Sequence, residues 1–578
     1  MPASSFATET FDATRWDQIE PRLKRLLEAP IEDAPGLERW LEDRSEIEAS
    51  CSEGAARLYI NMTCDTESAE AQQAYSDYIE QVAPKLKPIG FELDKRQAKL
   101  AAQFGLNSGR YEVIARDTKT AVEMFREENV PIQTELDQLS QKQQQITGAM
   151  TVEFEGEEKT LPQMGKYQES ADRGVREKAY KVVADRRMQD AEAISEIYDQ
   201  MVSRRDALGK NAGLANYVEY AFKGMLRFDY TPEHCFAFHA ACEKEVMPFC
   251  AALDKKRVEQ LGIDKLMPWD VSVDPKNRPP LRPFTDGADL VAKTRQVFNR
   301  LDPELGEMFA SMGDGKNTSG IATGELLDLD TRRGKAPGGY QYMQDKSRKP
   351  FIFMNAAGLH RDVETMVHEA GHAFHSMLCN DEPLLHYRHS PIEFAEVASM
   401  SMELLTMPYW DAYYPDPSEL ARARRKQMEG SISLLPWIAT IDAFQHWVYT
   451  HPKHTHQDRQ AHWLELEHRF GSAGARVSWD GLEKWRTHLW QRQGHLFGVP
   501  FYYIEYGIAQ IGALQLWLRS VEEGEAVALE AYKAAMSLGG SRPLPELFAA
   551  AGLTFDFGPE TVGRLVERVQ AELEKIPD

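Results

Sequence analysis

The sequence lacks any long uninterrupted apolar run, and this absence argues against a membrane-spanning helix. Such a helix needs about 20 consecutive, predominantly apolar residues, and no stretch of the chain approaches that length. The N-terminal segment MPASSFATETFDATRWDQ also lacks the basic region and apolar core of a secretory leader. We therefore expect neither a membrane partner nor a cleaved leader.

Cysteine and positive charge are both scarce. There are six cysteines in 578 residues, and none forms a Cys-x-x-Cys pair, which predicts reduced thiols in a cytoplasmic protein. The 67 Lys and Arg residues are outnumbered by 90 Asp and Glu residues, giving a net charge of −23. Because such a surface repels phosphates, nucleic acid is not an expected partner.

The most informative pattern that is present is His-Glu-Ala-Gly-His at residues 368–372. Apolar residues around it recur at helical spacing, which places His368 and His372 one turn apart on the same helix face. Two neutral imidazoles there can bind one zinc ion, and Glu369 can reach a zinc-activated water. The alternative is that these are three core polar groups, each of which would need its own buried partners. Asp362 is the predicted N-cap of this helix.

A second helical segment, SPIEFAEVASMSMELL at residues 390–405, offers the third ligand. Glu396 follows His372 by 24 residues, enough for a turn and a packed second helix, and His-His-Glu is a catalytic zinc set that leaves one position open. Glu403 lies two turns further on. We expect it to accept a hydrogen bond from the ring nitrogen of a zinc-binding histidine that does not contact the metal, and Glu393 is a second candidate for this role. Cys379 is disfavoured as a ligand, because a fourth protein ligand would fill the position that a catalytic zinc site leaves open.

A histidine-rich segment further along the chain reads YTHPKHTHQD around a proline turn. Its irregular polar spacing indicates an exposed loop rather than a built metal site. We group His446, His451, His454 and His456 in that loop.

Several blocks, in order, resemble the thimet oligopeptidase and oligoendopeptidase F family of zinc peptidases. HEAGHAFHS is followed by FAEVASMSMELL, and both resemble the zinc-binding helices of that family. GGYQYM at residues 338–343 and KPFIFMN at 349–355 resemble the segment and strand beside its active site. HLFGVPFYYIEY at 495–506 resembles its histidine-then-tyrosine block. The resemblance covers most of residues 200–565.

The resemblance implies a mechanism, which the chemistry of peptide hydrolysis supports. One zinc ion per chain would be bound by His368, His372 and Glu396, and Glu369 would act as general base and then as general acid. A donor on the opposite wall would stabilise the oxyanion. The candidates for this donor, with the first two favoured, are His495, Tyr503, Tyr506 and Tyr502. Their spacing departs from the thimet type, and aromatic packing is the alternative for each tyrosine.

The segments before the histidine pair are candidates for substrate binding. Residues 351–355 are flanked by Pro350 and predict an edge strand to which a peptide could add through backbone hydrogen bonds. Gly338 and Gly339 would allow close approach of a peptide, although ordinary turn glycines are an equal alternative. Tyr340 and Asn355 are included among the predicted substrate-binding residues.

The predicted fold is mainly α-helical, with a deep substrate channel and a small β-sheet beside the site, as the resemblance implies. We predict an N-terminal helical domain over residues 1–190, with a short hairpin near 150–162, and a catalytic domain over residues 191–578. A proline-rich connection interrupts the helical pattern at 267–284.

The predicted function is a zinc metalloendopeptidase, an oligoendopeptidase that hydrolyses internal bonds of short unstructured peptides. A carboxypeptidase or dipeptidyl carboxypeptidase is the nearest alternative, and an inactive peptide-binding protein is the alternative outside enzymes. A purely structural zinc site is a further possibility, and it predicts unfolding on chelation. The intact Glu369 favours catalysis, because binding alone needs no general base.

Overall fold

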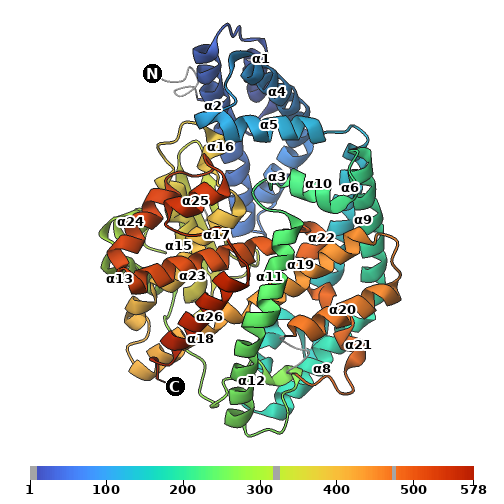
Figure 1. Cartoon of the computed structure of the whole chain (residues 1–578), viewed down its shortest axis with the longest axis vertical. Helices are drawn as coiled ribbons and strands as arrows, with labels where there is room; N and C mark the ends of the chain where they lie inside the picture. The colour runs from blue at the N-terminus through green and yellow to red at the C-terminus, as the bar shows by residue number, and fades with distance from the viewer. Residues whose placement is uncertain (1–9, 317–325, 472–476, 578) are drawn as a thin grey trace.

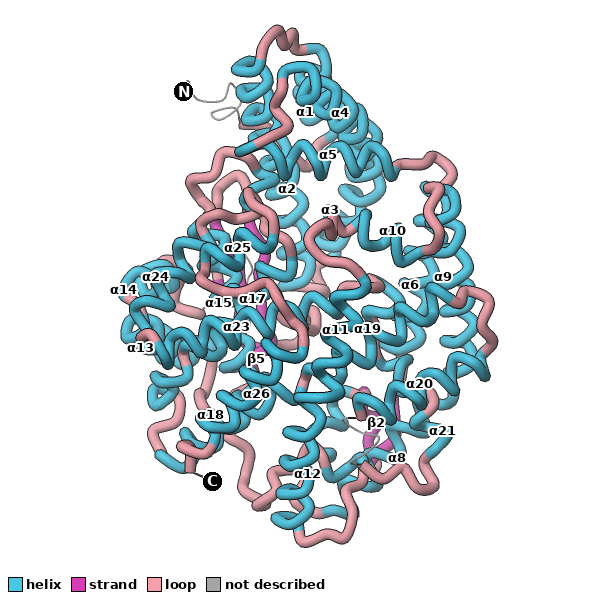
Figure 2. Tube along the Cα trace, viewed as in Figure 1, coloured by secondary structure: helices cyan, strands magenta, loops and turns pink. Residues whose placement is uncertain are grey.

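Helices form most of the chain, and the strands among the described residues belong to two small sheets (Figures 1 and 2). The computed structural model describes residues 10–316, 326–471 and 477–577. The mainly α fold expected from the sequence is confirmed. Residues 1–9, part of the N-terminal segment in which a leader would lie, are outside the described ranges. Among the described helices, none is both long enough and apolar enough to cross a membrane.

A second hydrophobic core lies among the N-terminal helices. It joins α1 to α5 through side chains between Ile19 and Ile114, and it also includes Leu384 and Tyr387 from the C-terminal half of the chain. The bounds of these helices are α1 Trp16–Glu28, α2 Ala34–Cys64, α3 Ala69–Gln81, α4 Ala83–Phe104, α5 Glu112–Met124 and α6 Asn129–Gly148. Figure 1 shows α1, α2, α4 and α5 clustered at one end of the molecule.

The predicted hairpin is present as β1 (Thr151–Phe154) and β2 (Glu157–Thr160), which pair antiparallel. Its turn is formed by Glu155 and Gly156, which both have positive φ. The helices that follow are α7 Gly165–Gln168, α8 Arg173–Gln189, α9 Ala191–Asn211, α10 Tyr217–Gly224, α11 Pro232–Ala241, α12 Met247–Leu261, α13 Gly287–Leu301 and α14 Pro303–Ala310. The division between domains near residue 190 stays a prediction.

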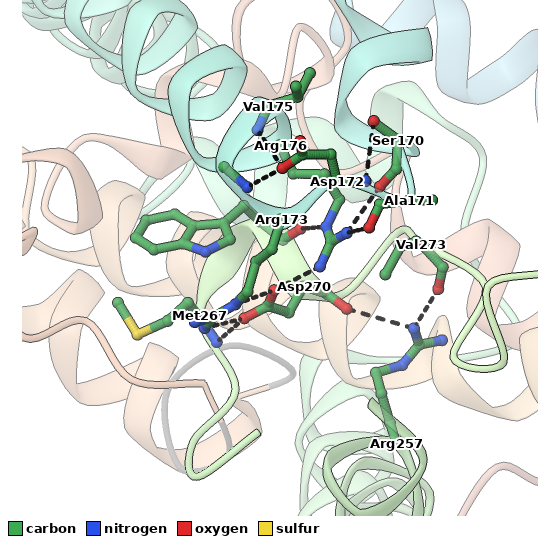
Figure 3. A network of polar contacts seen from close by, with 12 residues as sticks. Ser170, Ala171, Asp172, Arg173, Val175, Arg176, Arg257, Met267, Asp270 and Val273 are labelled. Atoms are coloured by element: carbon green, nitrogen blue, oxygen red, sulfur yellow. Dashed lines mark hydrogen bonds and ion pairs between the residues drawn. The ribbon is translucent and has the colours of Figure 1, made fainter. Parts of the chain in front are cut away.

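A buried carboxylate fastens α8 to the proline-rich connection (Figure 3). Asp270 is fully buried and forms ion pairs with Arg173 (2.7 Å) and Arg176 (3.0 Å), while the backbone N–H of Met267 donates to it at 3.1 Å. Paired and hydrogen-bonded in this way, a buried charge is tolerated. The connection is therefore anchored to the helices, although its sequence only indicates a break.

The second sheet consists of β3 (Leu327–Asp330), β4 (Tyr340–Gln344) and β5 (Lys349–Ala356). Its order is β3-β5-β4, with β5 parallel to β3 and antiparallel to β4. The prediction that residues 351–355 form an edge strand is therefore wrong, because β5 is paired on both sides. Its flanking proline lies near the strand start, where a missing N–H is tolerated. Among the described strands, β4 is the edge next to the glycine segment.

The C-terminal half of the chain contributes twelve further described α-helices, of which α15 packs against the second sheet. They are α15 His360–Leu378, α16 Leu385–Arg388, α17 Ile392–Leu405, α18 Pro417–Ser433, α19 Leu435–Thr450, α20 His456–Phe470, α21 Glu483–Arg486, α22 His495–Gly498, α23 Ile504–Glu522, α24 Glu525–Met536, α25 Leu544–Ala550 and α26 Pro559–Leu573. Most residues of α17 and α23 are buried, as expected for helices that are apolar on more than one face.

Two sequence expectations in this half are wrong in detail. Helix α15 begins at His360, so Asp362 is not the N-cap; its carboxylate accepts from the backbone N–H groups of Ala357 and Leu359, at 2.8 and 2.9 Å. His446 is not in an exposed loop, because α19 extends to Thr450 and buries it.

Candidate metal centre

Helix α15 places the predicted zinc histidines one turn apart, and their ring centroids are 4.9 Å apart. Glu369 is 8% exposed and sits between them in the sequence. Helix α17 packs directly on α15 and brings up Glu396. Its Oε2 lies 3.4 Å from His368 Nε2 and 3.6 Å from His372 Nε2.

The three donor atoms fit a metal ion. One atom from each of His368, His372 and Glu396 lies within 4.8 Å of the other two. Bonds of 2.0–2.1 Å in a tetrahedral zinc site separate neighbouring donors by about 3.3 Å, close to the distances here and longer than a good hydrogen bond. Cys379 does not join them, since its Sγ contacts the Met536 carbonyl at 3.1 Å.

Outer partners orient both histidines. Glu403 accepts from His368 Nδ1 at 2.7 Å and is held in turn by the Gln427 amide at 2.8 Å. The backbone of Ala395 lies beside His372. Both arrangements direct the inner ring nitrogens toward Glu396.

Glu393 does not take the orienting position that the sequence suggests. It accepts a 2.7 Å hydrogen bond from Tyr230 and lies 3.7 Å from Arg227. The backbone of Ala395 takes that place at His372, and no side-chain pattern could have revealed it.

The charges of the site interact strongly. Burial opposes protonation of His368, but the hydrogen bond and charge of Glu403 outweigh it and raise its pKa to about 9. Burial raises the pKa of Glu369 to about 7, with a further contribution from the Glu396 charge. Burial and the neighbouring His368 lower the pKa of His372. A carboxylate whose pKa lies near neutrality is suited to both accepting and returning a proton.

A cavity of about 640 Å³ opens over the site. It is lined by Gly338, Gly339, Asn355, His368 and Glu369, among others. Glycine is required at position 338, where φ is 104°, and the Asn355 amide donates to its carbonyl at 2.9 Å. Asn355 thus shapes the glycine segment that borders the cavity.

Tyr340 is already engaged on the other side of the edge strand. Its hydroxyl lies 2.6 Å from the Thr63 hydroxyl of α2, and its ring stacks on Phe353 with centroids 4.8 Å apart. This contact fastens the N-terminal helices to β4. The next residue, Gln341, hydrogen-bonds to Glu369 through its backbone, so the edge strand runs beside the predicted base.

His495 and the three predicted tyrosines gather at the start of α23. The ring centroids of Tyr502, Tyr503 and Tyr506 lie 5.8, 5.1 and 6.1 Å from that of His495. Burial raises the pKa of each tyrosine, and the Glu396 charge adds to this at Tyr502 and Tyr506, whereas Tyr503 interacts with Trp437. Tyr502 and Tyr506 are therefore the two tyrosines that the charge of the predicted ligand Glu396 affects.

A relay that sequence reasoning missed sets the tautomer of His495. The Trp437 indole N–H donates to Gln493 Oε1 at 3.1 Å, which fixes the orientation of the amide. The amide nitrogen of Gln493 then donates to His495 Nδ1 at 2.6 Å. Because burial lowers the pKa of His495, the neutral ring carries its proton on Nε2, a hydrogen-bond donor. The one sequence signal for this relay is that Gln493 stands two residues before His495.

Arg227 is a second missed residue. It is buried, donates to the Phe501 carbonyl at 2.5 Å, and pairs with Glu505 at 2.7 Å. Phe501 has a φ of 68°, an unfavourable conformation for a bulky residue. Arg227 therefore helps to stabilise the turn that precedes the tyrosines. This role cannot be recognised from the sequence, because Arg227 is far from Phe501 along the chain.

Comparisons with known proteins agree with this architecture. The solved structure of PZ peptidase A with an inhibitor has a TM-score of 0.86 and 26% identity, covering 99% of both chains. A candidate oligoendopeptidase F structure gives 0.87 and 26%, again over 99% of both. The oligoendopeptidase F homolog of Borreliella burgdorferi is 25% identical over 237 residues, which span 40% of this chain but only 38% of that relative. The model of peptidase family M3 matches residues 166–558, and the chain therefore belongs to peptidase family M3.

Proposed function

We propose that this protein is a zinc-dependent oligoendopeptidase that cleaves internal bonds of short peptides in the cytoplasm. The observation that carries the proposal is the convergence of His368, His372 and Glu396 beside a buried Glu369. His368 and Glu369 also line the cavity. Membership of peptidase family M3 supports the same chemistry. The six cysteines are buried and free of disulfides, which fits a reducing compartment.

The chain's own residues account for proton transfer. Zinc, when bound by the three ligands, supplies Lewis acidity and makes water more acidic. Glu369 takes the proton of the attacking water as a bond forms to the peptide carbonyl carbon. It then delivers that proton to the departing amine nitrogen as the C–N bond breaks. Its burial against Gln341 keeps the carboxylate in position for both steps.

His495 is our proposed oxyanion donor, together with Tyr502 or Tyr506. The Nε2–H of His495 is preset by Gln493 and needs no reorganisation during the reaction. We favour Tyr502 and Tyr506 over Tyr503 because the Glu396 charge influences both, whereas Tyr503 interacts with Trp437.

The peptide substrate is proposed to lie along the edge of β4 as an added strand. This strand is at the edge of the described sheet and follows Gly338 and Gly339, which line the cavity and leave room for a peptide backbone. Backbone pairing binds peptides of many sequences but requires an extended chain. Folded proteins are therefore excluded as substrates.

The deciding experiment uses a quenched fluorescent peptide of about ten residues, with both ends blocked or both free. We expect the zinc-loaded protein to cleave both forms at an internal bond, as identified by mass spectrometry, and to lose activity but not fold on chelation. Cleavage of the free-ended peptide alone would favour a carboxypeptidase or dipeptidyl carboxypeptidase. Absence of cleavage across a mixed peptide library would favour a binding protein.

Replacing Glu403 with glutamine is expected to weaken zinc binding by about 10- to 100-fold. The amide cannot offer His368 Nδ1 a charged acceptor, so the inner nitrogen becomes a poorer ligand. Competition with a zinc chelator measures the change. Glu364→Gln is the matched control, because Glu364 lines the same cavity but pairs with His360 at 3.0 Å. Equal affinities for the two variants would contradict the orienting role.

Removing the oxyanion donor is expected to lower kcat by about 10²- to 10³-fold with zinc content unchanged. His495→Phe, Tyr502→Phe and Tyr506→Phe test the proposed donors, and Tyr503→Phe is the matched control. Gln493→Leu should give a smaller loss, seen in kcat rather than KM, because His495 then takes either tautomer. A larger effect for Tyr503→Phe than for the other two tyrosines would reverse our assignment.

A further inference from the structure

A second cluster of metal-binding side chains lies where α11 contacts α19, and it shares no residue with the site above. Cys235 and His239 are four residues apart on α11, and Asp442 and His446 are four apart on α19. Each helix thus presents a pair of donors on one face. All four side chains are at most 5% exposed. One donor atom from each of Cys235, Asp442 and His446 lies within 4.8 Å of the other two.

The distance between Asp442 and His446 is that of metal ligands rather than of hydrogen-bond partners. His446 Nε2 is 3.5 Å from Asp442 Oδ2, beyond the usual range of a hydrogen bond. That distance falls between the 3.4 and 3.6 Å that separate Glu396 from its two histidines. Both His446 Nε2 and Asp442 Oδ1 are buried without a hydrogen-bond partner, a costly state that a bound cation would relieve.

Aromatic rings surround His446 within the cluster. The His446 ring contacts Phe222, Phe236 and Phe501, with centroids 5.0 to 6.0 Å away. A carboxylate in such a shell needs charge compensation. A divalent ion with one thiolate and one carboxylate ligand makes the cluster neutral, and sulfur with imidazole suits zinc.

We propose that Cys235, Asp442 and His446 bind a second transition-metal ion, zinc by donor chemistry. His239 is not one of these ligands; its Nε2 lies 2.8 Å from Asp442 Oδ2, a hydrogen bond that orients the carboxylate. One ligand comes from α11 and two come from α19, so the ion would fasten the two helices to each other. The proposal is independent of the peptidase function, because its test needs no activity.

Cobalt provides the test, because a thiolate ligand gives Co²⁺ a near-ultraviolet charge-transfer absorption. The full chain is produced in zinc-depleted, cobalt-supplemented medium, and its cobalt content and absorption spectrum are measured. We expect two cobalt ions per chain and the thiolate absorption. The site of His368, His372 and Glu396 contains no sulfur and cannot produce that absorption.

Substitutions locate the signal. Cys235→Ser should abolish the thiolate absorption, while Cys242→Ser, a buried cysteine whose Sγ contacts the Leu435 carbonyl at 3.7 Å, should retain it. Glu396→Ala should lose the other cobalt ion and keep the absorption. A wild-type protein without the absorption overturns the proposal whatever its cobalt content, even if Cys235→Ser does not fold. Absorption that survives Cys235→Ser also overturns it.

Discussion

Glu369→Gln is expected to lower kcat/KM for an end-blocked peptide by about 10²- to 10⁴-fold while one zinc ion stays bound at the His368, His372 and Glu396 site. The amide has nearly the same shape but cannot accept the proton of the attacking water or return it to the leaving amine. Glu369 is not among the three proposed ligands, so the metal affinity should stay close to that of the wild type. A fluorescence assay of peptide cleavage measures kcat/KM, and elemental analysis of the same preparation measures the bound zinc.

A matched variant separates loss of the base from loss of a negative charge. Glu530 is exposed on α24, and Glu530→Gln should leave kcat/KM unchanged. A Glu369→Gln protein that holds zinc and retains more than about a tenth of wild-type activity would contradict the general-base role. A protein that loses zinc would instead place Glu369 among the groups that hold the metal.

The parts of the candidate site that follow helical periodicity could be predicted from the sequence. Positions i and i+4 on one helix fix the relation of His368 to His372 whatever the tertiary context. The hydrogen bond from His368 to Glu403 also matches the predicted geometry, because the glutamate lies two turns beyond Glu396 on the same helix face. Local geometry determines these relations once the two helices pack together.

The parts that depend on distant partners could not be predicted. The sequence of residues 351–355 predicts an edge strand, but β3 comes from a segment more than 20 residues earlier and pairs with the other side of β5. The polar neighbours of His446 predict a loop, but α11, which packs against α19 and helps to bury His446, lies about 200 residues earlier in the chain. Arg227 contacts Phe501 across a separation of 274 residues. Burial of this kind is a tertiary property that local composition does not report.

The close approach of α15 and α17, on which the metal site depends, requires a glycine. A Cβ at Gly371 would lie 2.6 Å from Ser399 Cα and 2.7 Å from the Ala398 carbonyl oxygen. Both are backbone atoms of α17, so no side-chain rotation can relieve the overlap. On its other side α17 is held by α23, where a Cβ at Gly512 would lie 2.7 Å from Val397. Helix α17 therefore cannot move away from α15 without disturbing its close contact with α23.

Gly371→Ala is accordingly expected to destabilise the fold by about 1–3 kcal/mol through overpacking and to lower activity by about 10²-fold through displacement of Glu396 from the histidines. Denaturant unfolding, zinc affinity and peptide cleavage measure the three consequences. The control is Gly430→Ala on α18, where a Cβ meets nothing within 4 Å. Because alanine is the better helix former, that variant should gain about 0.5–1 kcal/mol and keep full activity. If both alanine variants bind zinc and cleave peptide like the wild type, the distance between α15 and α17 does not control the metal site.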